Sequence, residues 1–481
     1  MAVAAMPYRR AMGGTAGGEV PAIGLNGQHL TLKSGDIVDL QARLQGEVIT
    51  ATQSGYDAAR QLWNGAFDRK PAVIVRCVGA ADVRQAVGFA SGHGLLTAVR
   101  GGGHSFAGYS GCDGGLIIDL APMRTVRVDP IARVAQVGSG TLIGQMDRET
   151  QAFGLATPLG DSPGTGVAGL TLGGGLGWLR GRFGLTADNL LAADLVAADG
   201  NWLHASATDN PELLWALRGG GGNFGVVTAF TFRLHEVPGP MFGGTLAFDF
   251  ADARRLLRSY AEICADAPDD LSLGVDVAAE AGGVRTVELA VCYSGPISAA
   301  ERVVAPLRKL GKPLRDELAP TTYLQMQGSM DPPAVSRRGA CVRGGLAYAL
   351  TPSFIDAAVD YIEAAPPAPF VIELFNLGGA IGRVDPRDTA YWDRRAAHAL
   401  LIWGEWTIPG DGAERNTEWV RGAWKVLEPY TRGYYANFPS ADDSDKRIRA
   451  GYGDNYARLA RIKKRYDPTN LFRLNANIKP A

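Results

Sequence analysis

The stretch that decides the fold is RGGGHS at residues 100–105, where three glycines and a histidine directly follow the apolar stretch LLTAVR (95–100). Glycine adopts backbone conformations closed to other residues, so a glycine run can point several N–H groups into one concavity, which suits a diphosphate. A plain glycine turn would explain the glycines alone. A histidine on a rigid turn beside an anion site, however, is placed as a ligand or a nucleophile. The stretch therefore predicts a cofactor site at His104.

A second glycine-rich segment, GDSPGTGVAGLTLGGGLG, occupies residues 160–177. Its Gly164-x-Gly166-x-x-Gly169 spacing formally matches the dinucleotide fingerprint of nicotinamide enzymes. That fingerprint needs a strand before it and a helix opening within it. Here the preceding segment is turn-rich and another glycine run follows, so we expect a long loop that wraps a large flat cofactor. A nicotinamide enzyme remains a distant alternative.

Hydrophobic periodicity divides the chain near residue 238. Before it, strands and helices alternate, with a hairpin at Asp199-Gly200. The predicted strands are 71–78, 95–100, 115–120, 125–129, 132–137 and 225–234, and the predicted helices are 80–94, 141–153 and 211–217. From 240 to 440, further strands alternate with amphipathic helices, which indicates a second sheet backed by helices. The expected fold class is α+β.

Composition narrows the class of ligand. Hydrophobic residues make up 46% and charged residues 20% of the 481 residues, and the formal net charge is −1. Such a chain can bury a substantial core, and its lack of a basic face argues against a nucleic-acid partner. We expect a small-molecule ligand. No run approaches the ~18 apolar residues that span a bilayer, so no membrane partner is expected.

Cysteine usage and the N-terminus bear on the compartment. The five cysteines, Cys77, Cys112, Cys264, Cys292 and Cys341, are scattered and never form a CxxC, so neither a disulfide framework nor a metal site is expected. A cytoplasmic location fits best. Arg9-Arg10 allows export through a twin-arginine signal, but no continuous apolar segment follows, so export is not favoured.

Four ordered blocks carry a resemblance to a known family. They are RGGGHSFAGYS, GTGVAGLTLGGGLGWLRGRFGLTADNL, GGGGNFGVVTAFTF and NYARLARIKKRYDPTNLFRLNANIKP, and GGAIGRVDPRDTAYWDRR adds a thinner match in the middle. Together they resemble the berberine bridge enzyme-like branch of the vanillyl-alcohol-oxidase flavoproteins. The resemblance implies a PCMH-type FAD-binding domain of two α/β subdomains and a substrate domain with an antiparallel sheet backed by helices. The expected boundaries are a flexible arm at 1–35, an FAD-binding domain at 36–238, a substrate domain at 239–440, and a C-terminal segment at 441–481 that returns to the FAD-binding domain.

In that family the histidine after the glycines carries FAD through the flavin 8α-methyl group, which places this role on His104. Many members add a second bond from a cysteine, and Ser162 stands at that position here. A hydroxyl cannot replace a thiolate in that addition, so we predict one covalent bond. Thr165 corresponds to a gate over the oxygen-reactive face of the flavin. Its valine-like shape favours an oxidase that releases H2O2, although Thr165 could instead only hydrogen-bond within its loop.

The resemblance also implies cofactor contacts from a longer set of residues: Arg100, Gly101, Gly102, Gly103, His104, Ser105, Gly108, Gly160, Asp161, Gly164, Thr165, Gly169, Leu170, Gly173, Gly174, Gly175, Val227 and Asn475.

Catalysis needs a base near flavin N5. Family members often use the second tyrosine of a YxNY segment, but this chain reads Tyr435-Ala-Asn-Phe438, so that hydroxyl is missing. Tyr435 is the first candidate, with packing as its alternative role. Alternation along residues 399–406 puts Leu401, Trp403 and Glu405 on one face. Glu405 is then either a base or a charge at the rim of an aromatic pocket.

The expected function is an FAD-linked oxidase that takes hydride from an alcohol, a sugar hydroxyl or a C–N bond, or drives an oxidative cyclisation, and passes the electrons to O2. Two alternatives keep the same fold: a dehydrogenase that avoids oxygen, and a flavin-binding protein with little turnover. The second is motivated by Leu401 and Phe438, which replace polar family positions. The sequence leaves the substrate and the oligomeric state open.

Overall fold

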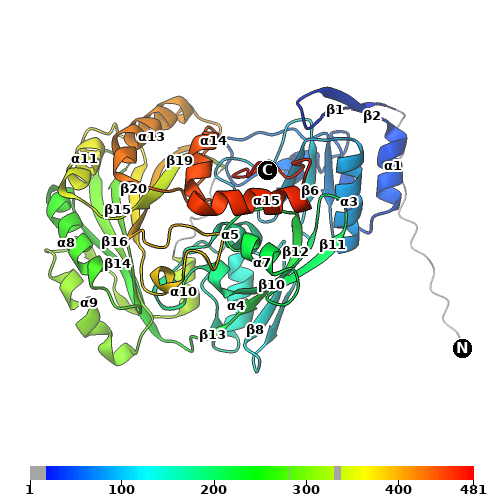
Figure 1. The fold of residues 1–481 in the computed structure, drawn as a ribbon. Coiled ribbons are helices and arrows are strands. Elements are labelled where there is room, and N and C mark those ends of the chain that lie inside the picture. Colours follow the sequence, from blue (N-terminus) through cyan, green and yellow to red (C-terminus); the bar gives the residue numbers. More distant parts are fainter. Residues whose placement is uncertain (1–17, 281, 330–336) are drawn as a thin grey trace, which may run out of the picture.

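The structure is a computed structural model that describes residues 18–280, 282–329 and 337–481. Figure 1 shows two parts side by side, one built on two smaller sheets and the other on a single large sheet. Helices and strands contribute to both parts, so the expected α+β class is confirmed.

The first sheet has the order β3-β4-β6-β5, in which β6 pairs in parallel with both β4 and β5. Its strands are β3 (Glu47–Ile49), β4 (Val73–Arg76), β5 (Thr97–Arg100) and β6 (Leu116–Asp119). Helix α3 (Ala80–Gly92) joins β4 to β5 and buries Val83, Ala86, Val87 and Ala90, which share one helical face. The predicted βαβ unit is therefore present, with β6 lying between its two strands.

The second sheet is antiparallel, in the order β11-β10-β12-β8-β7. Its strands are β7 (Val126–Asp129), β8 (Val134–Gly138), β10 (Leu190–Val196), β11 (Trp202–Ser206) and β12 (Val226–Arg233). Gly200 closes the predicted hairpin with φ of +81°, a value that suits glycine. Helices α4 (Ile143–Gln151) and α7 (Pro211–Leu217) lie where helices were predicted.

The large sheet follows the order β17-β14-β16-β15-β20-β21-β19 and is antiparallel throughout. Its long strands are β14 (Met241–Asp249), β15 (Leu271–Ala279), β16 (Arg285–Tyr293), β19 (Arg338–Ala347), β20 (Phe370–Asn376) and β21 (His398–Thr407), with the short strands β17 (Arg315–Asp316) and β18 (Ala319–Thr321) at one edge. Helices α8 (Ala253–Ala265), α9 (Ala300–Arg308), α11 (Pro352–Glu363) and α13 (Ala413–Leu427) lie along its outer side (Figure 1). Their apolar faces and the sheet form one core. The other face of the sheet is left for the site.

The N-terminal residues differ from the predicted arm. Residues 1–17, which include Arg9 and Arg10, lie outside the described residues. Strands β1 (Val20–Ile23) and β2 (His29–Leu32) form a hairpin, and helix α1 (Ser34–Ala42) follows. The arm prediction is wrong for residues 18–35, because Ala22 and Leu32 are buried in the core of the first sheet. The two strands are only four residues long each, too short for periodicity to reveal these two anchors in the sequence.

The C-terminal helices α14 (Asp445–Gly451) and α15 (Tyr456–Tyr466) cross back over the first part, and the chain ends beside its sheets (Figure 1). Leu471 and Phe472 join the core of the first sheet, and Ile478 joins that of the second. None of the helices in the described ranges is long and apolar enough to cross a membrane.

Candidate functional site

A cavity of about 900 Å³ lies where the glycine-rich loops of the first part meet the free face of the large sheet. The glycine-rich sequence blocks supply much of one wall, through many of the residues within 101–106, 160–176 and 221–227. Strands β15, β20 and β21 supply the other wall, and the C-terminal segment adds Phe472, Leu474 and Asn475. A cavity of this size, with glycine loops at one end and aromatic side chains at the other, suits a large cofactor and a small substrate.

The two glycine loops contact each other through their backbones. A Cβ atom on Gly102 would lie 2.5 Å from the Cα and N atoms of Gly166, and one on Gly166 would lie 2.5 Å from the N atom of Gly102. Gly103 has φ of +73°, in the left-handed region. Gly102 and Gly166 must therefore be glycines because the two loops touch through their backbones. The wall that would face the cofactor rests on this contact.

The second loop contains a helix that the sequence did not predict. Residues Val167–Gly173 form α5, whereas we expected an uninterrupted loop from 160 to 177. The helix is short because Gly174 and Gly175 follow with φ of +131° and +88°, which end it. Several of its residues face the cavity, including Ala168, Gly169 and Leu172. The segment before α5 is not a strand of a βαβ unit, so the nicotinamide fingerprint remains unmatched in structure.

His104 lies on the cavity wall and stacks on Trp63, with ring centroids 4.2 Å apart. The backbone N–H of Trp63 donates to the carbonyl of Gly103 at 3.1 Å, which holds the tryptophan against the glycine turn. Burial lowers the pKa of His104 to about 4, so its imidazole is neutral at physiological pH. A neutral imidazole has a free ring-nitrogen lone pair, which is the form that attacks an electrophile.

Most residues predicted to contact the cofactor line the cavity: Gly101, Gly102, Gly103, His104, Ser105, Gly160, Asp161, Gly164, Thr165, Gly169, Leu170, Gly173, Val227 and Asn475. Four others, Arg100, Gly108, Gly174 and Gly175, are not among the lining residues.

Those four residues support the site from behind its surface. The parallel register of β5 and β6 sets Arg100 beside Asp119, and its guanidinium donates two hydrogen bonds to that buried carboxylate at 3.1 and 2.7 Å. The positive charge is therefore neutralised within the sheet. Gly108 turns the chain with φ of +71°. Gly174 and Gly175 end α5, and the Gly175 N–H donates to the Tyr435 hydroxyl at 2.9 Å.

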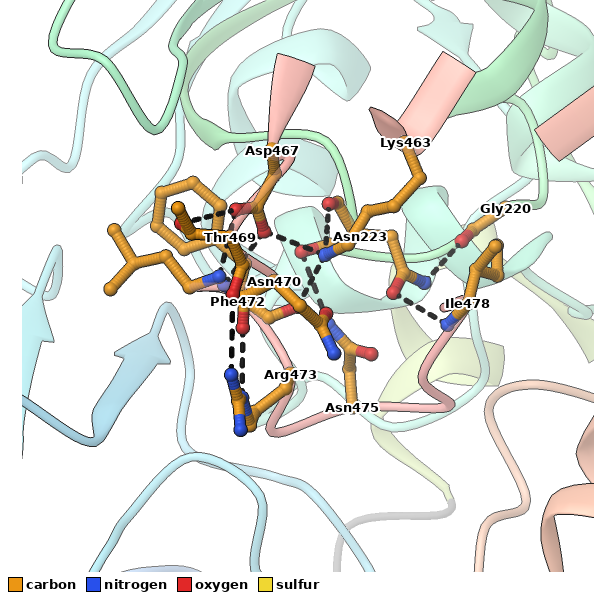
Figure 2. Close-up of polar contacts among 12 residues, drawn as sticks. Gly220, Asn223, Lys463, Asp467, Thr469, Asn470, Phe472, Arg473, Asn475 and Ile478 are labelled. Carbon is orange, nitrogen blue, oxygen red and sulfur yellow. Dashed lines mark hydrogen bonds and ion pairs between the residues drawn. The ribbon is translucent and has the colours of Figure 1, made fainter. Parts of the chain in front are cut away.

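Buried polar contacts fix the C-terminal segment to the first part (Figure 2). The ammonium of Lys463 donates to Asp467 at 2.7 Å and to the carbonyls of Asn223 and Phe472 at 2.8 and 2.9 Å. Both charged side chains are 0% exposed. Asn475 donates to the carbonyl of Gly222 at 3.2 Å. These contacts hold cavity-lining residues from two distant segments in place.

The cavity has features that fit FAD. A Cβ atom on Gly169 or Gly222 would meet nothing within 4 Å, so the backbone is open where these residues line the wall. Oδ1 of Asn475 is buried, lines the same region and has no hydrogen-bond partner among the described residues. An open backbone surface and a free amide acceptor are features that a dinucleotide site uses.

The other end of the cavity is apolar and aromatic. Leu401, Trp403 and Glu405 all line it, which confirms the face predicted from alternation along β21. Glu405 forms an ion pair with Arg338 at 3.2 Å, and both side chains are partly exposed. This pairing places Glu405 at the rim.

Tyr435 is buried on the cavity wall, with its ring 4.6 Å from that of Phe438. Its hydroxyl oxygen accepts hydrogen bonds from the Gly175 N–H and from Asn437 Nδ2, the latter at 3.0 Å. Burial raises the pKa of Tyr435 to about 12, so the phenol keeps its proton at neutral pH. The geometry therefore gives Tyr435 a role in holding the glycine turn at 173–175.

Two carboxylates in the cavity were not predicted from the sequence. Asp276 on β15 and Glu373 on β20 both line it. Glu373 lies directly across from Leu401 in the sheet, beside the position where we expected a polar residue. Alternation within FVIELFN (370–376) would have put Glu373 on a definable face, but nothing local indicated that this face meets the glycine loops.

Ser162 and Thr165 also line the cavity. The Thr165 backbone is fixed by bonds from its N–H to Ser162 and from the Ile143 N–H to its carbonyl, at 3.0 and 2.9 Å. No cysteine of the described residues lines the cavity, and Cys77, Cys112 and Cys292 are buried elsewhere. Within the same residues, no group of three or more His, Cys, Asp or Glu side chains is arranged to hold a metal ion.

Comparison with known proteins identifies the family that shares this architecture. Residues 71–206 match the family model described as FAD binding domain, and residues 434–479 match the one described as Berberine and berberine like. (R)-6-hydroxynicotine oxidase of Paenarthrobacter nicotinovorans is 32% identical over 453 residues, which cover 91% of this chain and 97% of that protein.

Two solved structures extend the comparison. The 6-hydroxy-D-nicotine oxidase of Arthrobacter nicotinovorans is 31% identical, with a TM-score of 0.85 over 91% of this chain and 98% of that one. Glucooligosaccharide oxidase of Acremonium strictum, in a structure that concerns its 6-S-cysteinyl, 8α-N1-histidyl FAD, is 25% identical, with a TM-score of 0.84 over 93% of this chain and 99% of that one. The chain belongs to the berberine bridge enzyme-like family of FAD-linked oxidases.

Proposed function

We propose that this FAD-linked oxidase carries its flavin on a single covalent bond to His104, takes hydride from a small organic substrate, and reduces O2 to H2O2. The observation that carries the proposal is the position of His104 on the cavity wall, where its imidazole stacks on Trp63 directly after the glycine turn. Burial also lowers the pKa of this imidazole to about 4, which favours the neutral form. The nicotine and oligosaccharide oxidases among the relatives support the reaction class.

A single bond is proposed because Ser162, rather than a cysteine, lines the cavity where the resemblance would put a second anchor. FAD, when bound, would supply the redox chemistry by accepting a hydride, which is two electrons and a proton, and passing two electrons to O2, which takes up two protons to give H2O2. The protein's own residues bind the cofactor and shape the pocket for the substrate. The two glycine loops give a backbone surface for the cofactor, and Leu401, Trp403 and Phe438 form an apolar pocket that excludes water from the reacting carbon.

Thr165 is proposed to leave the flavin open to oxygen. Its side chain is small, and its backbone hydrogen bonds hold it in place on the cavity wall. A bulkier side chain at this position would fill the space beside the wall. Thr165→Leu is therefore expected to slow the reaction of the reduced flavin with oxygen.

The test reduces the flavin anaerobically with dithionite and mixes it with air-saturated buffer in a stopped-flow instrument, while H2O2 is measured with peroxidase. We expect fast reoxidation, one H2O2 per flavin, and reoxidation at least about tenfold slower in Thr165→Leu. Slow reoxidation of the wild type would identify a dehydrogenase instead. This readout needs no substrate, so it is independent of the substrate's identity.

A further inference from the structure

A row of side chains crosses the large sheet beneath the substrate end of the cavity. Antiparallel register places Glu288, Asp276, Glu373 and Leu401 opposite one another on β16, β15, β20 and β21. Directly opposite residues in such a sheet have Cβ atoms about 5 Å apart. Asp276 and Glu373 both line the cavity, whereas Glu288 does not. The cavity floor therefore presents two adjacent carboxyl groups.

The protein supplies no ion-pair partner for this pair. Among the described residues, Asp276 has no hydrogen bond or salt bridge from any side chain, and Glu373 accepts a single bond, from Trp403 Nε1 at 2.9 Å. The nearby cation is Arg180, and its guanidinium donates to Asn376 and to the carbonyls of Gly177 and Leu273 instead. A third carboxylate, Asp161, also lines the cavity. Arg337 and Arg338 also line the cavity, but Arg337 pairs with Asp68 at 3.5 Å and Arg338 with Glu405 at 3.2 Å. The floor itself therefore keeps an excess of acidic groups.

Without a ligand, the surroundings of Asp276 and Glu373 disfavour the state in which both carboxyl groups are ionised. Burial raises the pKa of Asp276 to about 7, with Glu288 and Asp161 adding to the effect, and burial together with Asp276 and Asp161 raises the pKa of Glu373 well above its usual range. Only 8% of Glu373 is exposed. Adjacent buried carboxyls share a proton rather than ionise together. A cation placed between them would reverse this and let both ionise.

The geometry points to a cationic amine as the substrate, bound as its ammonium form by Asp276 and Glu373 beneath the indole of Trp403. This inference rests on the proposed oxidase function and specifies its substrate class. The ammonium fits the carboxyl pair, and the aromatic side chains Phe106, Trp403 and Phe438 favour a cation with apolar substituents. An uncharged sugar would donate hydroxyl hydrogen bonds to the pair but bring no positive charge, so it would not let both carboxyls ionise.

The same carboxyl pair provides an acceptor for the proton that the ammonium must lose before the amine is oxidised. The N–H bond of the ammonium breaks, and its proton passes to the Glu373 carboxylate, which Trp403 orients. The nitrogen lone pair then forms the C=N bond while the adjoining C–H bond breaks and its electron pair leaves as hydride for the flavin. The amine is oxidised by two electrons, the flavin is reduced by two, and the proton on Glu373 leaves to water after product release.

A binding experiment on the holoenzyme tests the recognition. Benzyltrimethylammonium, which has no N–H bond and no lone pair to oxidise, is titrated against its uncharged isostere neopentylbenzene, with the flavin absorption spectrum as readout. We expect the cation to bind roughly 30-fold more tightly, the lower end for a desolvated charge pair. The double variant Asp276→Asn/Glu373→Gln should lose this preference. Glu288→Gln should keep it, because Glu288 pairs with Arg315 at 3.0 Å outside the cavity.

Anaerobic reduction of the flavin by N-methylbenzylamine and by benzyl alcohol provides the second readout. Faster reduction by the amine, lost in Glu373→Gln and retained in Glu288→Gln, supports the inference. Equal binding of benzyltrimethylammonium and neopentylbenzene, or a preference that survives the double variant, would overturn it. Either result would leave the oxidase proposal standing, because reoxidation by O2 and the bond to His104 are measured without a substrate.

Discussion

Burial fixes the protonation of the residues that matter most in this cavity. His104 is neutral because desolvation lowers its pKa, and the Tyr435 phenol stays protonated because desolvation raises its pKa. Asp276 and Glu373 are held partly protonated by the same effect. Free carboxyl groups are ionised at neutral pH in water, so the underionised pair is a state that the cavity imposes.

The raised pKa of Asp276 predicts a pH effect on the stability of the protein without a ligand. An aspartate ionises near pH 3.9 when unfolded and at about 7 in the folded protein. The folded state thus binds more protons between these values, and this contribution to stability is lost as pH rises from about 4 to about 7. The slope is at most about 1.4 kcal/mol per pH unit for one proton.

Thermal unfolding from pH 4 to 8 measures this effect. The unfolding free energy of Asp276→Asn should fall less steeply across the window than that of the wild type. Parallel pH profiles for the two proteins would show that Asp276 ionises normally. The other charged groups facing Asp276 are Glu288, Glu373 and Asp161, and all three are unchanged in the variant.

At the scale of elements, the site depends on two glycine loops that pack against each other. Gly102→Ala should therefore disrupt the loop contact, because the new methyl group would lie 2.5 Å from the Gly166 backbone. We expect FAD incorporation to drop by at least about tenfold and stability to fall by about 1–3 kcal/mol, as for overpacked sites. The flavin-to-protein absorbance ratio and thermal unfolding provide the measurements.

Gly88→Ala is the matched control, because Gly88 is exposed within α3 and an added Cβ there meets nothing within 4 Å. Alanine should raise helix stability slightly at that position and leave FAD content unchanged. Normal FAD loading in Gly102→Ala would contradict the importance of the loop contact.

Sequence patterns predicted a helix or strand well where the hydrophobic period and the turn residues lie within that element. The six strands and three helices predicted between residues 71 and 234, the hairpin at Gly200 and the free face of β21 follow from periodicity and turn residues. Helix α5 was missed because its glycines read as a loop, although buried apolar residues sustain two turns. Arg100 was assigned to the cofactor because its partner, Asp119, is brought beside it only by the parallel register of β5 and β6.

The carboxyl pair was missed for a related reason. Asp276 and Glu373 lie almost a hundred positions apart in the chain and become neighbours through pairing of β15 with β20. No pattern within either strand indicates which face of the sheet meets the glycine loops. The cavity-lining glycines and His104 could be found because each of their motifs is contiguous, whereas the substrate end is assembled from three strands.

At the scale of the whole molecule, the cavity exists because three distant segments converge on it. The glycine loops come from the first part, the floor from the large sheet, and part of the wall from the C-terminal segment. The buried Lys463–Asp467 pair holds that last segment to the loop at Asn223, whose carbonyl accepts a hydrogen bond from Lys463 (Figure 2). FAD bound in this cavity would stabilise the folded arrangement through its binding free energy.

The central claim is the single covalent bond between FAD and His104, and peptide mapping tests it most directly. The purified protein is precipitated with acid, digested, and analysed by mass spectrometry beside His104→Ala, whose fold is checked by circular dichroism. We predict that wild-type flavin stays with the precipitate on one peptide, the one that contains His104, and that the flavin of the variant is released into the supernatant. Flavin attached to a cysteine, or wild-type flavin released by acid, would contradict the account.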